Sequence, residues 1–120
     1  MSHARLLIVD DDSYTRFALR NLFARRGWAV DLAASVAEGL ATLDDAHRAV
    51  ILDLNLPDGG GEEVLIEVRR RAARTMVAVC SASVDPRQIA AVQGLRPELM
   101  LCKPIDMGSL DRMCLAAMAG

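Results

Sequence analysis

Polar side chains that could do chemistry follow four short apolar segments of the chain. The segments are RLLIV, AVIL, TMVAVC and ELMLC, and the side chains after them are Asp10 with Asp11 and Asp12, Asp53, Ser81 and Lys103. Adjacent carboxylates repel one another, so a bound cation is the physical reason to bring at least two of them together with Asp53. Oxygen ligands with no convergent His or Cys suit Mg²⁺. These residues therefore predict a magnesium site.

Asp53 is also a candidate nucleophile, because it ends a predicted strand and precedes a turn that exposes its carboxylate. Such a carboxylate can attack a phosphoryl group and form an acyl phosphate. The Lys103 ammonium and the Ser81 hydroxyl would then stabilise the charge on the transferring group. Lys103 is the one lysine among 14 Lys and Arg residues, and its site suits a compact ammonium better than a guanidinium. The alternative interpretation of Lys103 is a surface lysine at a sheet edge, and that of Ser81 is an ordinary loop hydroxyl.

Asp12 has a structural explanation of its own. It directly precedes Ser13, where a helical pattern begins, so its carboxylate can cap the first helix and favour its positive end. We therefore expect Asp12 to be a cap, and Asp10 and Asp11 to be the metal ligands.

The elements that must position these side chains alternate between short apolar runs and amphipathic stretches. Predicted strands cover 5–9, 28–33, 49–52, 75–80 and 98–102. Predicted helices cover 13–26, 35–46, 62–72, 86–92 and 106–117, and 56–61 is a loop. Gly27 stops the first helix, and Ser35 with Glu38 forms a capping box at the second.

Continuous apolar strands separated by helices predict an α/β fold with a parallel sheet covered on both faces. In such sheets, ligands gather outside the carboxyl ends of the strands, where the strand order reverses. The four polar groups follow the first, third, fourth and fifth strands, so we expect them to meet at that edge.

Composition limits the remaining possibilities. A chain of 120 residues that is 52% hydrophobic fits a single domain, residues 1–120, with a real core. A net charge of −2 argues against direct nucleic-acid binding. There is no membrane-length apolar run or signal peptide, which predicts a cytoplasmic protein. The three cysteines, Cys80, Cys102 and Cys114, lie in apolar stretches and are expected to be reduced core thiols.

The pattern as a set resembles the receiver domain of two-component response regulators over essentially the whole chain. An acidic pair follows the first strand, Asp53 is followed by Pro57 and Gly61, Ser81 is followed by Ala, and Lys103 is followed by Pro104. The resemblance implies a flavodoxin-like, doubly wound fold. Its five-stranded parallel sheet has the order 2-1-3-4-5, with five helices on both faces.

By the same resemblance, Asp53 is the phosphoacceptor, and Asp10, Asp11, Asp53 and the backbone carbonyl of Asn55 hold Mg²⁺. Ser81 is the hydroxyl that follows the phosphoryl group, and Lys103 is the ion-pairing lysine. Asn55 and Ser83 tune the lifetime of the phosphoryl group, and a cis peptide precedes Pro104. Pro57 and Gly61 are structural. Met100 occupies the position where receivers usually carry an aromatic switch residue, and a thioether can repack there.

The implied function is a phosphorylatable signalling switch, not a stand-alone enzyme. A sensor histidine kinase or a histidine phosphotransfer protein would donate the phosphoryl group to Asp53. The surface of the fourth helix, fifth strand and fifth helix would then control an output domain or a protein partner, as a monomer or as a phosphorylation-dependent dimer. No output domain is expected within this chain.

Two other readings compete with this one. Met100 favours a receiver-fold module that only binds or dimerises. The segment DDDSYT also looks like the start of a haloacid-dehalogenase-type phosphatase, with Asp10 as nucleophile and Asp12 as general acid. That reading leaves Asp53 without a role.

Overall fold

The computed structural model describes residues 3–71, 74–82 and 85–119. The strands are β1 (Arg5–Val9), β2 (Ala29–Ala33), β3 (His47–Leu52), β4 (Asn55–Leu56), β5 (Gly59–Gly60), β6 (Met76–Ser81) and β7 (Leu99–Cys102). The helices are α1 (Ser13–Arg25), α2 (Val36–Thr42), α3 (Glu62–Arg70), α4 (Pro86–Gly94) and α5 (Met107–Ala119).

The main sheet has five parallel strands in the order β2-β1-β3-β6-β7. These are the five predicted strands, so the expected order 2-1-3-4-5 is confirmed. The strand order reverses beside β1, which starts the chain and lies between β2 and β3. The carboxyl ends of β1 and β3 therefore flank the point where a ligand is expected.

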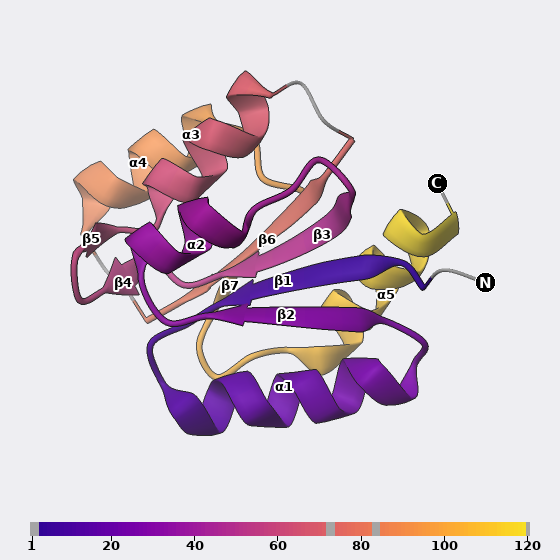
Figure 1. Cartoon of the computed structure of the whole chain (residues 1–120). Coiled ribbons are helices and arrows are strands. Elements are labelled where there is room, and N and C mark those ends of the chain that lie inside the picture. The colour runs from indigo at the N-terminus through magenta and orange to yellow at the C-terminus, as the bar shows by residue number, and fades with distance from the viewer. Residues whose placement is uncertain (1–2, 72–73, 83–84, 120) are drawn as a thin grey trace.

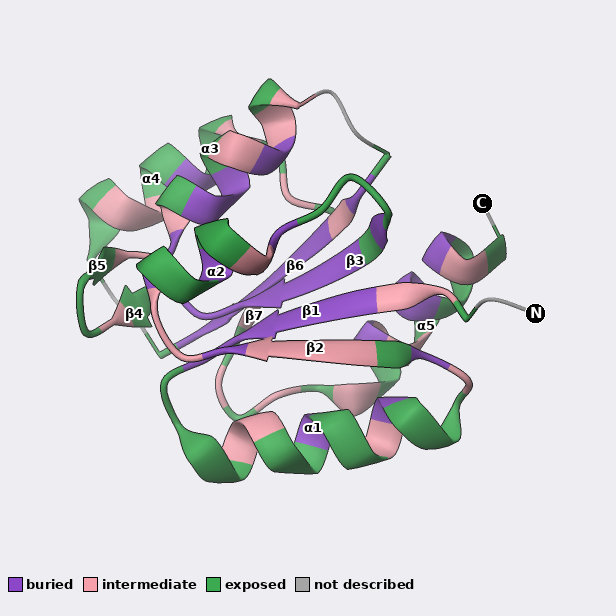
Figure 2. Ribbon diagram, viewed as in Figure 1, coloured by how far each residue is buried: buried purple, intermediate pink, exposed green. Residues whose placement is uncertain are grey.

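Helices cover both faces of this sheet (Figure 1): α1 and α5 lie on one face, and α2, α3 and α4 lie on the other. Successive residues of β1 serve the two faces in turn. Leu6 and Ile8 pack with Phe23 and Leu110 on the α1–α5 face. Leu7 and Val9 belong to the core on the other face. Figure 2 shows β1, β3 and β6 as mostly buried and the outer sides of the helices as exposed.

The second helix is shorter than predicted. It ends at Thr42, not Ala46, because Leu43 adopts an extended ψ of 130°. The Asp44 carboxylate then accepts a hydrogen bond from the Ala46 amide at 2.7 Å, which stabilises a turn in place of a further helical turn. Strand β3 consequently begins at His47, two residues before the predicted start at Ala49.

The predicted loop 56–61 contains a small hairpin. Strands β4 and β5 pair antiparallel, with Asn55 opposite Gly60 and Leu56 opposite Gly59. Gly59 has a φ of +151°, a conformation that residues with a Cβ rarely adopt. The predicted end of the third helix at Ala72 lies outside the described residues.

One of the three cysteines was predicted wrongly. Cys80 and Cys114 are buried, and burial raises the pKa of each thiol to about 12. Cys102 is exposed, because it is the last residue of the edge strand β7, where no further strand covers it. It is therefore a surface thiol and not a core residue.

Candidate functional site

Two backbone hydrogen bonds fix the start of the acidic loops at the carboxyl edge of the sheet. The Asp10 amide donates to the Ala33 carbonyl at 3.0 Å, and the Asp53 amide donates to the Val9 carbonyl at 2.9 Å. Both bonds continue the strand pairing by one residue beyond the strand ends. The two aspartates therefore leave neighbouring strands at the same level.

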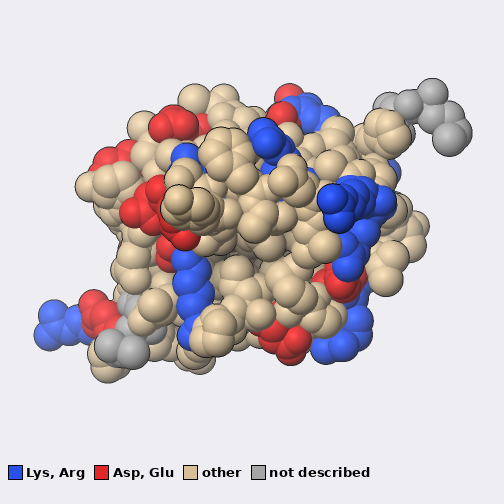
Figure 3. All heavy atoms as spheres, turned by 90° about the horizontal axis from the view of Figure 1, so that it is seen from below, with Lys and Arg blue, Asp and Glu red and all other residues tan. Residues whose placement is uncertain are grey.

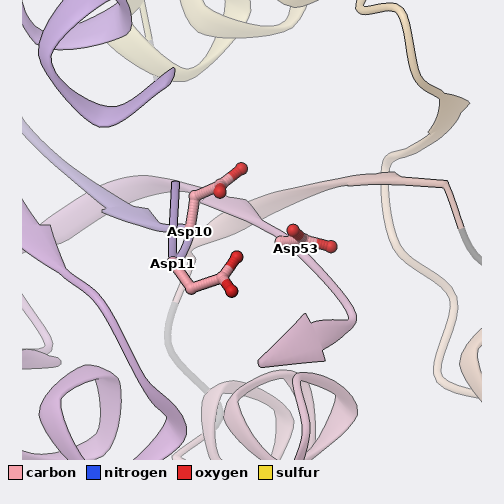
Figure 4. A group of neighbouring side chains, drawn as sticks. All are labelled: Asp10, Asp11 and Asp53. Atoms are coloured by element: carbon pink, nitrogen blue, oxygen red, sulfur yellow. The ribbon is translucent and has the colours of Figure 1, made fainter. Parts of the chain in front are cut away.

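The carboxylates of Asp10, Asp11 and Asp53 converge there. One oxygen of each lies within 4.8 Å of the others, and Figure 4 shows the three side chains as neighbours at the ends of their strands. Asp10 and Asp53 are buried, whereas Asp11 is exposed. Hard oxygen ligands open to solvent on one side suit Mg²⁺, which keeps several of its waters. The donor set fits the predicted ion.

Lys103 lies between the two buried carboxylates. Its Nζ donates to Asp10 Oδ2 at 2.9 Å and to Asp53 Oδ2 at 3.2 Å. Burial works against the charged ammonium, but hydrogen bonds and Coulomb attraction from Asp10 and Asp53 outweigh it. The pKa of Lys103 is therefore above its usual value. The ammonium balances part of the negative charge of the site.

The loop after Asp53 folds back onto the phosphoacceptor candidate. The Asn55 amide donates to Asp53 Oδ1 at 3.1 Å, and the Gly61 amide donates to the Leu54 carbonyl at 2.9 Å. A Cβ on Gly61 would overlap the Asp53 carbonyl oxygen. Position 61 thus requires glycine for steric reasons, whereas Pro57 is exposed at the tip of the hairpin.

Ser81 lies at the same edge, at the end of β6. It is buried, and its Oγ accepts a hydrogen bond from Asn55 Nδ2 at 3.5 Å. The Ser81 carbonyl accepts a hydrogen bond from the Lys103 amide at 3.1 Å. This bond at the ends of β6 and β7 keeps Ser81 and Lys103 next to each other. Ser83, the other predicted hydroxyl, lies outside the described residues.

The remaining predicted residues occupy the surroundings of the site. The peptide bond between Lys103 and Pro104 is cis. Met100 on β7 is partly buried and packs against the core of the α2–α4 face. It is therefore on the face of the sheet that α4 covers.

Asp12 is the N-cap of α1, which confirms the structural expectation. Its carboxylate accepts hydrogen bonds from the Tyr14 amide at 3.3 Å and the Thr15 hydroxyl at 2.6 Å. The hydrogen bond from Thr15 contributes most, and together these bonds lower the pKa of Asp12. The side chain is not in the triad that could hold a metal ion. This placement gives no support to Asp12 as a general acid.

Three contacts beside the site were not predicted from the sequence. Arg16 donates to the Asp10 carbonyl at 2.8 Å. Asp58 accepts from the Val36 and Ala37 amides, at the start of α2. Gln88 donates to the Leu54 carbonyl at 3.3 Å. In each case the partner is a backbone group, which every residue provides, so residue types and spacing carry no signal for the contact.

Charge elsewhere on the molecule is mixed. On the face that carries α1 and α5, basic side chains are separated by acidic ones (Figure 3). Among the described residues, no helix is both long enough and apolar enough to cross a membrane.

Comparison with known proteins places these features in a family. The family model described as response regulator receiver domain matches residues 6–114. The acid tolerance regulatory protein ActR of Rhizobium meliloti is 42% identical over 75 residues, which are 62% of this chain and 39% of ActR. The photosynthetic apparatus regulatory protein RegA of Rhodobacter capsulatus is 28% identical over 116 residues, 96% of this chain and 63% of RegA. The chain thus spans less than two thirds of the length of either relative.

A solved structure shows the same fold. The CheY-like receiver domain protein from Methanospirillum hungatei JF-1 superposes with a TM-score of 0.85 at 22% identity. The match covers 97% of this chain and 94% of that one. The doubly wound architecture is therefore shared along nearly the full length of both chains.

Proposed function

The chain belongs to the response regulator receiver family, and we propose that residues 1–120 act as a phosphorylation switch with Asp53 as the phosphoacceptor. Membership makes it a signalling module and not a stand-alone enzyme, and it implies a cognate histidine kinase. The observation that carries the proposal is the position of Asp53. Its buried carboxylate converges with Asp10 and Asp11 and accepts a hydrogen bond from Lys103.

Phosphoryl transfer at this site needs a nucleophile and fixed positive charge. An Asp53 oxygen forms the new O–P bond while the N–P bond of a phosphohistidine donor breaks and the imidazole leaves. The Lys103 ammonium and the Ser81 hydroxyl donate to the phosphoryl oxygens as negative charge develops on them. Asp10, Asp11, Asp53 and the Asn55 carbonyl would hold Mg²⁺, which supplies further charge neutralisation when it is bound.

The acyl phosphate changes the charge at the edge of the sheet. It carries roughly −1.5 to −2 charges and three strong acceptor oxygens, which attract Lys103 and Ser81. These two residues end β6 and precede α5, so their movement alters the loops that lead into α4 and α5. The surface of α4, β7 and α5 would then change its affinity for an output domain or a protein partner. Water later hydrolyses the acyl phosphate, and the side chains of Asn55 and Ser83 influence how easily that water reaches the phosphoryl group.

The test is incorporation of labelled phosphoryl groups from acetyl phosphate. We expect incorporation that requires Mg²⁺ and is lost in Asp53→Asn, which keeps the side-chain shape but removes the nucleophile. The matched control is Asp45→Asn. Asp45 lies just before β3, at the end of the sheet opposite to the carboxylate site, and forms an ion pair with Arg71. This variant should therefore incorporate label normally. Incorporation that persists in Asp53→Asn, or that does not need Mg²⁺, would contradict the proposal.

A further inference from the structure

The peptide unit between Leu54 and Asn55 touches the phosphoacceptor at one end and α4 at the other. Its N–H, on Asn55, donates to Asp53 Oδ1 at 3.1 Å. Its carbonyl, on Leu54, accepts from the Gly61 amide at 2.9 Å and from Gln88 Nε2 at 3.3 Å. A peptide unit is planar and rigid, so its two ends cannot rotate independently. A change at the carbonyl therefore changes the hydrogen bond to Asp53.

Gln88 is held in place to make this contact. It lies near the start of α4, which Figure 1 shows beside α3 and the hairpin, and it is partly buried. Its Nε2 also donates to Glu62 Oε2 at 3.0 Å, on the first residue of α3. A side-chain amide has two N–H donors, so one goes to the Leu54 carbonyl and the other to Glu62. The Glu62 carboxylate thus orients the amide.

Donation to a carbonyl polarises the whole amide and strengthens the hydrogen bond from its N–H. We propose that Gln88 is a positioning residue for Asp53, which it orients through the Leu54–Asn55 peptide and thereby couples to α4. The inference rests on the proposed function of Asp53 and adds a residue that none of the site motifs contains.

The coupling acts in both directions. A carboxylate is a stronger hydrogen-bond acceptor than the carbonyl of an acyl phosphate, because it is charged. Phosphorylation of Asp53 therefore weakens the bond from Asn55, and the peptide holds Gln88 less firmly. Coupling between two sites is reciprocal, so fixing the start of α4 in turn favours one state of Asp53.

The first experiment compares rates of phosphorylation. Gln88→Met keeps the length of the side chain and removes its donors, whereas Gln88→Lys keeps a donor that can reach a carbonyl and a carboxylate. The matched control is Gln93→Met, on the exposed side of the same helix. With saturating Mg²⁺ and acetyl phosphate, we expect Gln88→Met to react roughly 2- to 10-fold more slowly, because the loss of orientation of the Asp53 carboxylate outweighs the gain from a weaker hydrogen bond to its unphosphorylated form. Gln88→Lys should recover most of the rate, and Gln93→Met should match the wild type.

The second experiment uses the Asn55 amide resonance in the unphosphorylated protein. We expect its proton to shift upfield in Gln88→Met, as the bond to Asp53 weakens, and to stay unchanged in Gln93→Met. Wild-type rate and wild-type Asn55 shift in Gln88→Met would overturn the inference while leaving the role of Asp53 intact. Phosphorylation that persists in Asp53→Asn would instead overturn the proposed function, and the Asn55 shift would still test the contact.

Discussion

Gly61 shows how strictly a single residue constrains the site. A Cβ at this position meets the carbonyl oxygen of Asp53, which is backbone and cannot move away as a flexible side chain could. The Gly61 amide also binds the Leu54 carbonyl, so the loop cannot open without losing a hydrogen bond. The close approach of two backbone segments, and not an unusual φ, is what excludes other residues here.

We therefore predict different effects on stability for two glycine-to-alanine substitutions. Gly61→Ala should lower the free energy of unfolding by about 1–3 kcal/mol, the usual range for overpacking, and slow phosphorylation by displacing Asp53. Gly94→Ala, at the end of α4, places its methyl group in open space and should leave stability unchanged or raise it by up to about 1 kcal/mol. Urea unfolding measures both. Equal stability of the two variants would contradict the steric argument.

The residues of the site differ in how well the sequence predicts them. Asp10, Asp11, Asp53, Ser81 and Lys103 follow apolar strands, so a parallel sheet must bring them to one edge. The position of Gly61 belongs to the family pattern, but its steric reason appears only in three dimensions. Arg16 binds the carbonyl of Asp10, six residues earlier, and Gln88 binds that of Leu54 in another loop, and no pattern of residue types indicates such partners.

At the scale of elements, strands and helices were predicted well and their ends less well. The boundary of α2 depends on Asp44, whose side chain can bind the backbone of a turn as well as follow a helix. The β4–β5 hairpin forms within a glycine-rich segment that has no alternating apolar pattern to reveal it. Local competition between a side chain and the backbone decided the first case, and the lack of a residue pattern hid the second.

Helix α2 depends on a cap from a distant part of the chain. It has 7 residues, too few to be stable alone, and Asp58 accepts from its Val36 and Ala37 amides at 2.8 and 2.9 Å. These hydrogen bonds hold the pKa of Asp58 below its usual value, and the one from the Ala37 amide contributes most. Since the folded-state pKa is depressed, the cap stabilises the protein above the unfolded pKa of about 4 and is lost as pH falls through the folded value.

We predict that hydrogen-exchange protection of the Val36 and Ala37 amides depends on this carboxylate. In the wild type, protection relative to an unstructured peptide should fall between pH 5 and pH 2. In Asp58→Asn it should be lower at pH 5 and change less on acidification. Asp12→Asn, which alters the cap of α1, should leave both amides as in the wild type. Protection in Asp58→Asn that equals the wild type at pH 5 would show that Asp58 does not hold α2.

At the scale of the whole molecule, the fold concentrates negative charge at one edge of the sheet. Three carboxylates and the Lys103 ammonium leave two negative charges uncompensated, which a divalent cation would balance. Asp10 and Asp53 are tied to Lys103, whereas Asp11 is exposed and reaches the site from the loop before α1. The folded sheet is what brings the three carboxylates together, so the unfolded chain has no comparable site.

This difference predicts that Mg²⁺ stabilises the protein through Asp11. At a Mg²⁺ concentration one hundred times its dissociation constant, binding adds about 2.7 kcal/mol to the free energy of unfolding, which raises the melting temperature by several degrees. Asp11→Asn should reduce this increase and should not lower the stability of the metal-free protein, because it relieves repulsion. Asp12→Ala should keep the full response to Mg²⁺ while losing stability from the cap of α1. Comparing the two variants separates the roles of two adjacent aspartates. An equal response to Mg²⁺ in Asp11→Asn and the wild type would show that Asp11 is not a metal ligand.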